Sequence, residues 1–178
     1  SRSTTDGYIR NAFADVQSAM AVVGWMNERN SLRLTWLMGD QHTGITWEGI
    51  SLAQYEKDRR YNPAGEYEDE YGNLHYYDNE TDNYTQHHLQ LNYTHSFSDR
   101  LAWSSTFNYT RGDGYYENYK AGKSFSKYLM PSPVVGGVQY DEGDFITKEA
   151  LANDYFVLNS DLRYNSELLD LTAGINLS

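Results

Sequence analysis

The sequence of 178 residues contains no cysteine, only three prolines, and fewer basic than acidic residues. Without cysteine, the chain forms no disulfide bond and offers no thiolate to a metal ion. Its 14 basic and 25 acidic residues give a formal net charge of −11, which argues against a nucleic acid as a partner. No stretch reaches the ~18 apolar residues that a transmembrane helix needs. A transmembrane β-strand is not excluded, because it is apolar only at every second residue.

Aromatic residues are abundant instead, with 17 Tyr, 6 Phe and 4 Trp. Disordered chains are poor in such residues, so the composition predicts a folded structure. Six stretches alternate apolar and polar residues with a period of two, the pattern of β-strands with two different faces. The predicted strands lie near residues 14–28, 31–46, 84–97, 101–117, 154–165 and 168–178.

The links between these strands alternate between very short and very long. Short links lie near residues 28–30, 98–100 and 166–167, whereas long loops span about 47–83 and 118–153. Short turns at one end and long loops at the other are typical of outer-membrane β-barrels. We therefore predict an all-β fold of antiparallel up-and-down strands with short periplasmic turns and long extracellular loops. Single-chain bacterial barrels begin at about eight strands, so these six would form part of a larger transmembrane barrel.

Each predicted strand has one face that is more apolar than the other. Leu162 and Leu171 belong to the apolar faces of the last two strands, whereas Asn159, Asp161 and Arg163 share the opposite face. A water-filled or plugged lumen accommodates such polar residues, and so does a soluble sheet with one solvated face. In the first strand both faces are apolar. Its outward set is therefore left open between Ala19, Val23 and Trp25 on one face and Met20, Val22 and Met26 on the other.

The first long loop is acidic and rich in tyrosine. Residues 48–82 include 10 acidic and three basic residues, a net charge of about −7. Clustered carboxylates at Asp78, Glu80 and Asp82 resemble the start of a calcium-binding loop, although the glycine and the final glutamate of an EF-hand are missing. We therefore expect no cofactor other than a calcium ion that these three carboxylates would hold in the loop.

Several short motifs favour structural explanations. The glycine of Arg111-Gly112-Asp113 is expected where a strand leaves the sheet and enters a loop. The neighbouring His87 and His88 are expected on opposite faces of a strand, where they cannot bind one metal ion from the same side. The sequence contains no nucleophile–base pair, phosphate-binding loop or metal-ligand spacing, so we do not expect an enzyme.

Four segments resemble TonB-dependent outer-membrane receptors of the Bacteroidetes type. They read TWEGI at 46–50, YNPAG at 61–65, YDNETDNYTQHHLQLNYTHSF at 77–97 and TRGDGYYENYK at 110–120. The plug domain and the TonB box of that family are not in this sequence. The resemblance implies that the chain is an early-to-middle part of a 22-stranded barrel in the outer membrane of a Gram-negative cell.

The resemblance also implies a function, namely active uptake of a scarce nutrient. The expected ligand is an iron chelate (a siderophore), and the expected partners are outer-membrane lipid, the TonB complex acting through the plug region, and a surface lipoprotein. An anionic chelate fits poorly with the acidic loop, which would repel it. The alternative is a self-contained soluble or surface β-domain that binds carbohydrate through its tyrosines. In that family, loops contact the ligand, and here the corresponding candidates are Trp47, Tyr61, Tyr115, Tyr116 and Tyr119.

Overall fold

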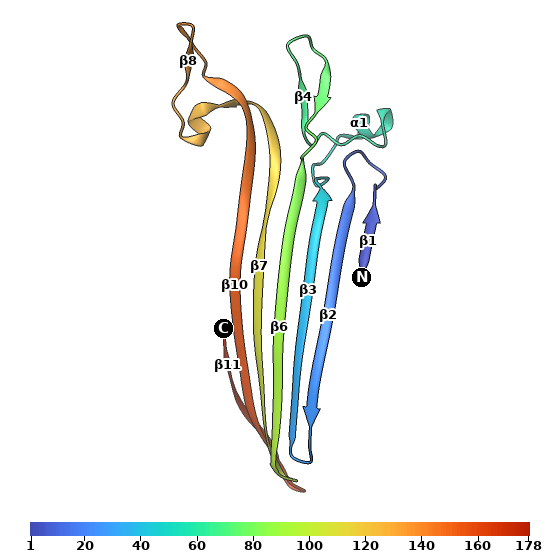
Figure 1. Ribbon diagram of the computed structural model, residues 1–178, viewed down its shortest axis with the longest axis vertical. Helices are drawn as coiled ribbons and strands as arrows, with labels where there is room; N and C mark the ends of the chain where they lie inside the picture. The colour runs from blue at the N-terminus through green and yellow to red at the C-terminus, as the bar shows by residue number, and fades with distance from the viewer.

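The computed structural model describes all 178 residues and is dominated by one antiparallel sheet of seven strands (Figure 1). The strands follow one another in the order β1-β2-β3-β6-β7-β10-β11, so each is hydrogen-bonded to its neighbours in an up-and-down arrangement. The sheet is open, with β1 and β11 as its edges. Its strands are β1 (Arg2–Thr5), β2 (Ala14–Met26), β3 (Asn30–Gly44), β6 (Thr81–Ser98), β7 (Leu101–Ser124), β10 (Glu142–Asn165) and β11 (Asp170–Leu177).

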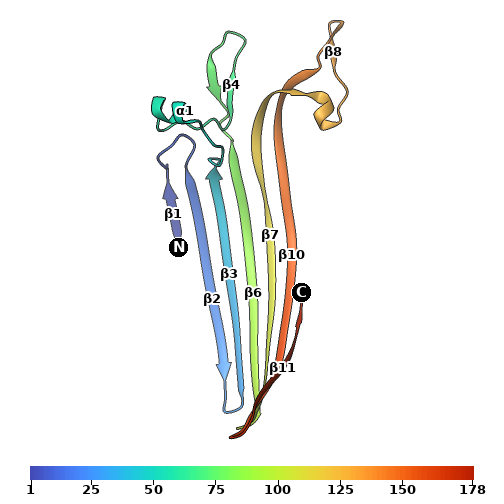
Figure 2. The ribbon, with the colours of Figure 1, turned by 180° about the vertical axis from the view of Figure 1, so that it is seen from behind.

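All long connections lie at one end of the sheet and all short turns lie at the other (Figures 1 and 2). The turns at residues 27–29, 99–100 and 166–169 are as short as the sequence predicts. The loop between β3 and β6 contains the helix α1 (Leu52–Lys57) and a hairpin of β4 (Glu66–Glu68) and β5 (Leu74–Tyr76). The loop between β7 and β10 contains a 3₁₀ turn (Phe125–Tyr128) and a hairpin of β8 (Val134–Val135) and β9 (Val138–Gln139).

The sequence predictions of an all-β fold and of antiparallel up-and-down strands are confirmed, but two details differ. A seventh strand, β1, pairs with the start of β2. In addition, β7 continues to Ser124 and β10 begins at Glu142, so the second loop spans residues 125–141 rather than 118–153. The large apolar residues of the β10 extension, Phe145, Ile146 and Leu151, do not keep to one face, and a hydrophobic period of two therefore gave no signal there.

The strand pairing decides which residues share a face of the sheet. Directly paired residues lie on the same face, and Trp25 pairs with Leu32, which in turn pairs with Tyr93. This register settles the open question of β2: Ala19, Val23 and Trp25 lie on the face formed by the apolar residues of the other strands. Met20, Val22 and Met26 lie on the opposite face. We call these two surfaces the apolar face and the polar face.

The apolar face carries a continuous band across six strands, which we call the apolar band. On β7 and β10, five paired rows form it, from Leu101 with Tyr164 to Tyr109 with Phe156. The next row holds the ion pair of Arg111 and Asp154, with 3.3 Å between nitrogen and oxygen. The band consists of Ala21, Val23 and Trp25 on β2, Leu32, Leu34, Trp36 and Met38 on β3, Leu89, Leu91 and Tyr93 on β6, Leu101, Trp103, Ser105, Phe107 and Tyr109 on β7, Phe156, Leu158, Ser160, Leu162 and Tyr164 on β10, and Leu171, Ala173, Ile175 and Leu177 on β11.

The polar face is held together by side-chain hydrogen bonds that run between neighbouring strands. Thr106 Oγ1 on β7 donates to Asn92 Oδ1 on β6 at 3.0 Å, and Asn176 Nδ2 on β11 donates to Asn159 Oδ1 on β10. His88 contacts Thr110 on this face at 2.8 Å, whereas His87 stacks on Trp36 on the apolar face. The two histidines therefore lie on opposite faces, as predicted.

Gly112 and Gly114 lie inside β7 and not at a strand-to-loop exit, which corrects the sequence prediction. On the polar face, the Tyr84 ring of β6 covers both glycines, and a Cβ atom added at either position would overlap Tyr84. The Tyr84 hydroxyl then reaches Asn153 Oδ1 of β10 at 3.3 Å. One tyrosine thus spans three strands because the glycines leave room for its ring.

We predict that Gly112→Ala destabilises the sheet by about 1–3 kcal/mol, because its methyl group displaces the Tyr84 ring. Gly39→Ala is the matched control, since Gly39 also lies inside a strand but has no atom within 4 Å of an added Cβ. Urea unfolding followed by tryptophan fluorescence measures both variants. Equal unfolding midpoints for the two variants would contradict the packing of Tyr84 on Gly112.

Candidate functional site

Buried residues are few and gather at the loop end of the sheet. Only 10 of the 178 residues are buried, and most of them connect the β3–β6 loop to the ends of β3, β6 and β7. This small core is largely polar: Ile45, Asn62, Ala64, Glu80, Thr81, Glu117 and Asn118. The sheet itself is covered by no second layer on either face, so the loop end is the part of the molecule where side chains converge.

Glu80 organises this core. Its carboxylate accepts hydrogen bonds from Asn118 Nδ2 at 2.6 Å and from the backbone N–H of Tyr119 at 2.8 Å. Its backbone carbonyl accepts from Asn11 Nδ2 of the β1–β2 loop at 2.8 Å. Because Glu80 is 1 % exposed, these donors compensate the cost of burying its polar groups. Glu80 therefore connects two loops to β7.

A second carboxylate, that of Glu117 on β7, holds the end of the same loop. It accepts hydrogen bonds from the Tyr77 hydroxyl and from Asn79 Nδ2 at 2.6 Å, and Lys148 Nζ lies 3.3 Å away. The two hydrogen bonds are the largest influence on the Glu117 carboxyl and lower its pKa, and Lys148 lowers it further. The charged form of Glu117 thus stabilises the docked loop.

Aromatic rings extend this contact outward along the β4–β5 hairpin. The Tyr119 ring lies 4.6 Å from Tyr67 and 5.8 Å from Tyr77 between ring centroids, and Tyr67 stacks on His75. Burial and a hydrogen bond to Asp144 raise the pKa of Tyr119 to about 12. Tyr119 therefore remains a neutral hydrogen-bond donor and anchors the hairpin on β7.

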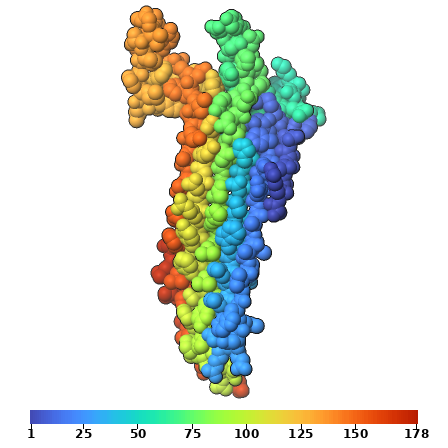
Figure 3. All heavy atoms as spheres, in the orientation of Figure 1, coloured from blue at the N-terminus to red at the C-terminus, as the bar shows by residue number.

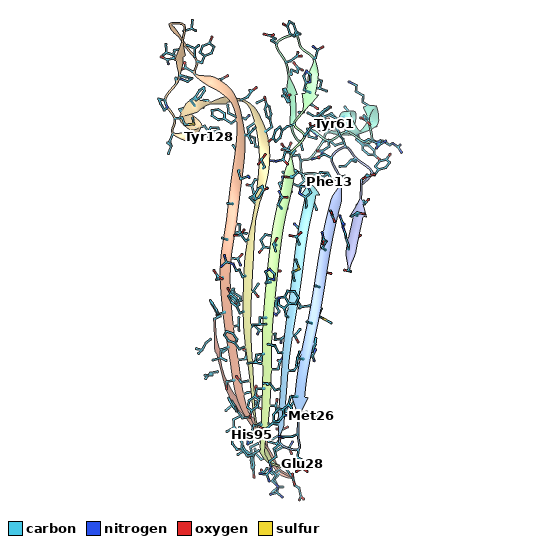
Figure 4. All side chains as sticks on the ribbon, in the orientation of Figure 1. Phe13, Met26, Glu28, Tyr61, His95 and Tyr128 are labelled. Atoms are coloured by element: carbon cyan, nitrogen blue, oxygen red, sulfur yellow. The ribbon has the colours of Figure 1, made fainter.

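The five predicted ligand-contact residues fall into three places. Trp47 and Tyr116 meet edge to face, 5.7 Å apart, on the polar-face side of the sheet. Tyr115 and Tyr119 belong to the apolar-face side above the band, where Lys148 Nζ lies 3.8 Å from the Tyr115 ring. Tyr61 lies apart from both, beside α1 and the β4–β5 hairpin. Figure 4 shows Tyr61 at the loop end, opposite Met26 and His95 at the turn end.

Tyr116 lines a shallow groove of about 340 Å³ together with Tyr84, Asp82, Glu149 and Leu151. A hydrogen bond to Glu149 is the largest influence on the Tyr116 hydroxyl and raises its pKa. Trp47, 59 % exposed, borders the same region through its contact with Tyr116. Aromatic rings beside carboxylates form a surface that can bind a small molecule with apolar parts and hydrogen-bond donors.

A second groove of about 470 Å³ lies between α1 and the β4–β5 hairpin, and it includes Tyr61. Tyr76 of the hairpin forms part of its wall. Arg10 of the β1–β2 loop places its guanidinium 3.4 Å from the centre of the Tyr76 ring and donates to the Ala64 carbonyl at 2.9 Å. Sequence reasoning missed this groove, because Tyr61 and Tyr76 are 15 positions apart in the chain and no local motif links them.

The three calcium candidates do not converge. Asp78 is exposed, whereas the Glu80 carboxylate is buried and already accepts two hydrogen bonds. Asp82 lies on the polar face in the row of Tyr116. The structure contains no group of three or more His, Asp or Glu side chains placed to hold a metal ion.

Comparisons with known proteins gave no further identification. No family model, no curated protein and no solved structure matches the chain. None of the helices in the structure has the length and apolar character needed to cross a membrane.

We predict that protonation of Glu117 at low pH weakens the attachment of the β3–β6 loop to β7. Because the folded state lowers the pKa of this carboxyl, its contribution to stability is present above the unfolded pKa of ~4.3 and is lost as the pH falls through the folded pKa. Hydrogen exchange of residues 77–80 should therefore rise below about pH 4. In Glu117→Gln this rise should shrink, because the position no longer titrates. An unchanged acid profile in Glu117→Gln would contradict this role.

Proposed function

We propose that this chain forms part of the wall of a transmembrane β-barrel in the outer membrane, within a receptor that takes up a small nutrient. The observation that carries the proposal is the apolar band. Its five rows on β7 and β10 occupy nine residues of each strand, from Leu101 to Tyr109 and from Phe156 to Tyr164. A tilted strand crosses a bilayer in about 9–11 residues.

The boundaries of the band also fit a membrane. Nine residues of extended strand span about 27 Å along the strand, or about 21 Å along the membrane normal at a tilt of about 40°, and the apolar belt of outer-membrane barrels is about 25 Å tall. Aromatic residues lie near both limits, with Trp25, Trp103 and Tyr164 towards the turns and Trp36 and Tyr109 towards the loops. Such residues favour the membrane–water interface.

The band does not begin at the same row on every strand. On β7 it runs from the row of Leu101 to the row of Tyr109, whereas on β3 it begins at Leu32, two rows nearer the loops, and extends to Met38. Strands of a barrel tilt by about 35–45°, so a level membrane meets neighbouring strands at different registers. The later start on β3 is compatible with a barrel wall.

Polar atoms in the middle of the band have partners within the sheet. Ser160 Oγ accepts a hydrogen bond from the Trp103 indole at 2.8 Å, and Ser105 Oγ donates to the Asn159 carbonyl at 3.1 Å. In lipid no water is present to replace such partners, so unpaired hydroxyls would be costly. The two serines are therefore compatible with a lipid-facing surface.

The alternative of a self-contained soluble domain fits the exposed surface poorly. The chain exposes 12692 Å², whereas a compact monomer of 20.5 kDa exposes about 8,900 Å². Apolar side chains on the band contribute to this exposed area, such as Val23 (68 % exposed), Ile175 (60 %) and Leu171 (55 %). Contiguous apolar patches of this size are rare on soluble monomers. If lipid covers the apolar face, these apolar side chains are no longer exposed to water.

The open edges of the sheet give the same conclusion. β2 is covered only over its first residues by β1, and β11 has no strand on its outer side. Unpaired backbone groups in lipid are too costly to persist. In the proposal, further strands of the same barrel pair with both edges, as they would in the 22-stranded receptors that the sequence resembles.

The uptake function rests on the resemblance to TonB-dependent receptors and on the aromatic surfaces at the loop end. In this proposal an iron chelate reaches the outer side of the barrel, and the TonB complex drives its passage through a plug region. Trp47 and Tyr116 are the favoured contact residues, because they lie on the polar-face side that would border the lumen. The acidic loop favours a cationic or neutral chelate over an anionic one.

We predict that Ile175→Lys prevents membrane assembly and that Asn176→Lys does not. Ile175 lies in the middle row of the band, where a lysine facing lipid costs about 2–4 kcal/mol. Asn176 is its neighbour on the polar face, so the same charge would face the lumen. Heat-modifiable mobility of the full-length protein in the outer-membrane fraction distinguishes the two. Normal assembly of Ile175→Lys would refute the lipid-facing assignment.

For uptake, we predict that Trp47→Ala and Tyr116→Ala each reduce accumulation of a labelled ferric chelate about tenfold, in keeping with aromatic contact residues. Tyr71→Ala is the control, because Tyr71 is 81 % exposed at the hairpin tip, away from this pair. Cationic, neutral and anionic ferric chelates are tested with and without functional TonB. Accumulation that is independent of TonB would indicate a passive pore.

A further inference from the structure

The pairing of β7 with β10 is interrupted once, near its outer end. The two strands pair without a break from Leu101 to Lys120 of β7, and the register then shifts, so that residues 121 and 122 lie opposite Asp144 alone. Gly122 has a φ of +56°, in the left-handed region that favours glycine. The irregularity separates the regular ladder from an outer segment, residues 123–143, which we call the flap.

The flap stands apart from the neighbouring long loop. Figure 3 shows its β8–β9 hairpin and the β4–β5 hairpin as two separate projections at the loop end. Val134 and Val135 are each 64 % exposed and Val138 is 56 % exposed, so the tip of the flap has little packing of its own. Contacts at the base of the flap therefore decide where it lies.

One carboxylate at this base bridges the irregularity. Asp144 accepts hydrogen bonds from the backbone N–H of Gly122 at 2.9 Å and from the Tyr119 hydroxyl. The bond from Tyr119 is the largest influence on the Asp144 carboxyl and, together with that from Gly122, it lowers the pKa of this group. Asp144 is therefore charged at neutral pH and holds the base of the flap on β7.

Tyr119 connects the same carboxylate to the other long loop. Its ring centroid lies 4.6 Å from that of Tyr67 and 5.8 Å from that of Tyr77. Its backbone N–H donates to the Glu80 carboxylate at 2.8 Å. One residue thus packs on the β3–β6 loop with its ring and binds Asp144 of the β7–β10 hairpin with its hydroxyl.

From these contacts we infer that the two long loops are held and released together, with the Tyr119–Asp144 hydrogen bond as the link between them. While the β4–β5 hairpin is docked, Tyr67 fixes the Tyr119 ring, and the hydroxyl holds Asp144 on Gly122. When the hairpin is released, the ring loses this support, Asp144 lets go of Gly122, and the flap turns about residues 121–122 and 144. Such a coupling is reciprocal, so release of the flap weakens docking of the hairpin.

Hydrogen exchange of the full-length protein in detergent, without ligand, measures both ends of this link by mass spectrometry. The readouts are the Gly122 amide for the flap and the Tyr77 amide, which donates to the Gly65 carbonyl at 2.8 Å, for the hairpin. Tyr119→Phe keeps the ring and removes only the hydroxyl, so exchange at Gly122 should rise about tenfold, as expected when a hydrogen bond to a charged group is lost. Tyr128→Phe is the matched control, because its ring packs within the flap and its hydroxyl makes no hydrogen bond.

Asp144→Ala tests the reciprocal direction. It should raise exchange at Gly122 about tenfold and exchange at Tyr77 about three- to fivefold, because a free flap weakens docking of the hairpin. Asp141→Ala removes the same charge from the flap and is the control. Asp141 accepts a side-chain hydrogen bond within the flap at 2.6 Å and does not bind Tyr119, so this variant should leave exchange at Tyr77 unchanged.

A double-mutant cycle decides whether the Tyr119 hydroxyl carries the coupling. Tyr67→Ala should raise exchange at Gly122 about three- to tenfold, in keeping with the loss of an aromatic pair. In a Tyr119→Phe background, the same substitution should have no further effect on Gly122. Tyr71→Ala is the control for the hairpin, because Tyr71 is 81 % exposed at its tip and does not contact Tyr119.

Two results would overturn the inference. The first is an equal effect of Asp144→Ala and Asp141→Ala on exchange at Tyr77, since Asp144 would then stabilise only its own loop. The second is an undiminished effect of Tyr67→Ala on Gly122 in the Tyr119→Phe background, since the hydroxyl would then carry no coupling. The inference goes beyond the proposed function and is tested without ligand or membrane, so it can fail while the receptor proposal stands, and the reverse.

Discussion

The backbone register of the sheet is the constraint on which the rest of the structure depends. A shift of one residue would move every apolar side chain to the opposite face. From β2 to β11, the pairing places Trp25, Leu32 and Tyr93 in one row and keeps polar residues such as Asn92 on the other face. The apolar band therefore exists only because neighbouring strands agree in register, and the proposed membrane boundary follows from it.

The same register explains how the two ends of the sheet differ. Towards the turns, the strands need only alternate apolar and polar residues, and short turns suffice. Beyond the row of Arg111 and Asp154, apolar and polar residues are mixed on both faces, and stability comes from specific contacts such as those of Glu80 and Tyr84. The strands thus change from a lipid-compatible surface to a scaffold that holds loops, and the candidate binding surfaces lie on that scaffold.

The sequence predicted the parts of the structure that depend on local pattern. Strands such as β6 and β11 were predicted because apolar and polar residues alternate along them. The turns were predicted because this alternation is interrupted there. The end of β7 beyond residue 117 and the first half of β10 were not predicted, since apolar and charged residues such as Ile146 and Lys148 share a face there without any apolar period. The groove between α1 and the β4–β5 hairpin was missed for a related reason: Tyr61, Glu66 and Tyr76 come together through the fold of a loop, which spacing along the chain does not encode.

Acidic residues in the loops do more than keep the surface solvated. Several acidic side chains here have structural partners, as Glu117 does with Tyr77 and Lys148, and their charge is used within the protein. Glu66 also acts on groups of the protein, because burial and this neighbouring carboxylate raise the pKa of the Tyr61 and Tyr76 hydroxyls. A carboxylate that stabilises a fold is satisfied by that fold, so the net charge of a loop does not by itself identify a binding residue.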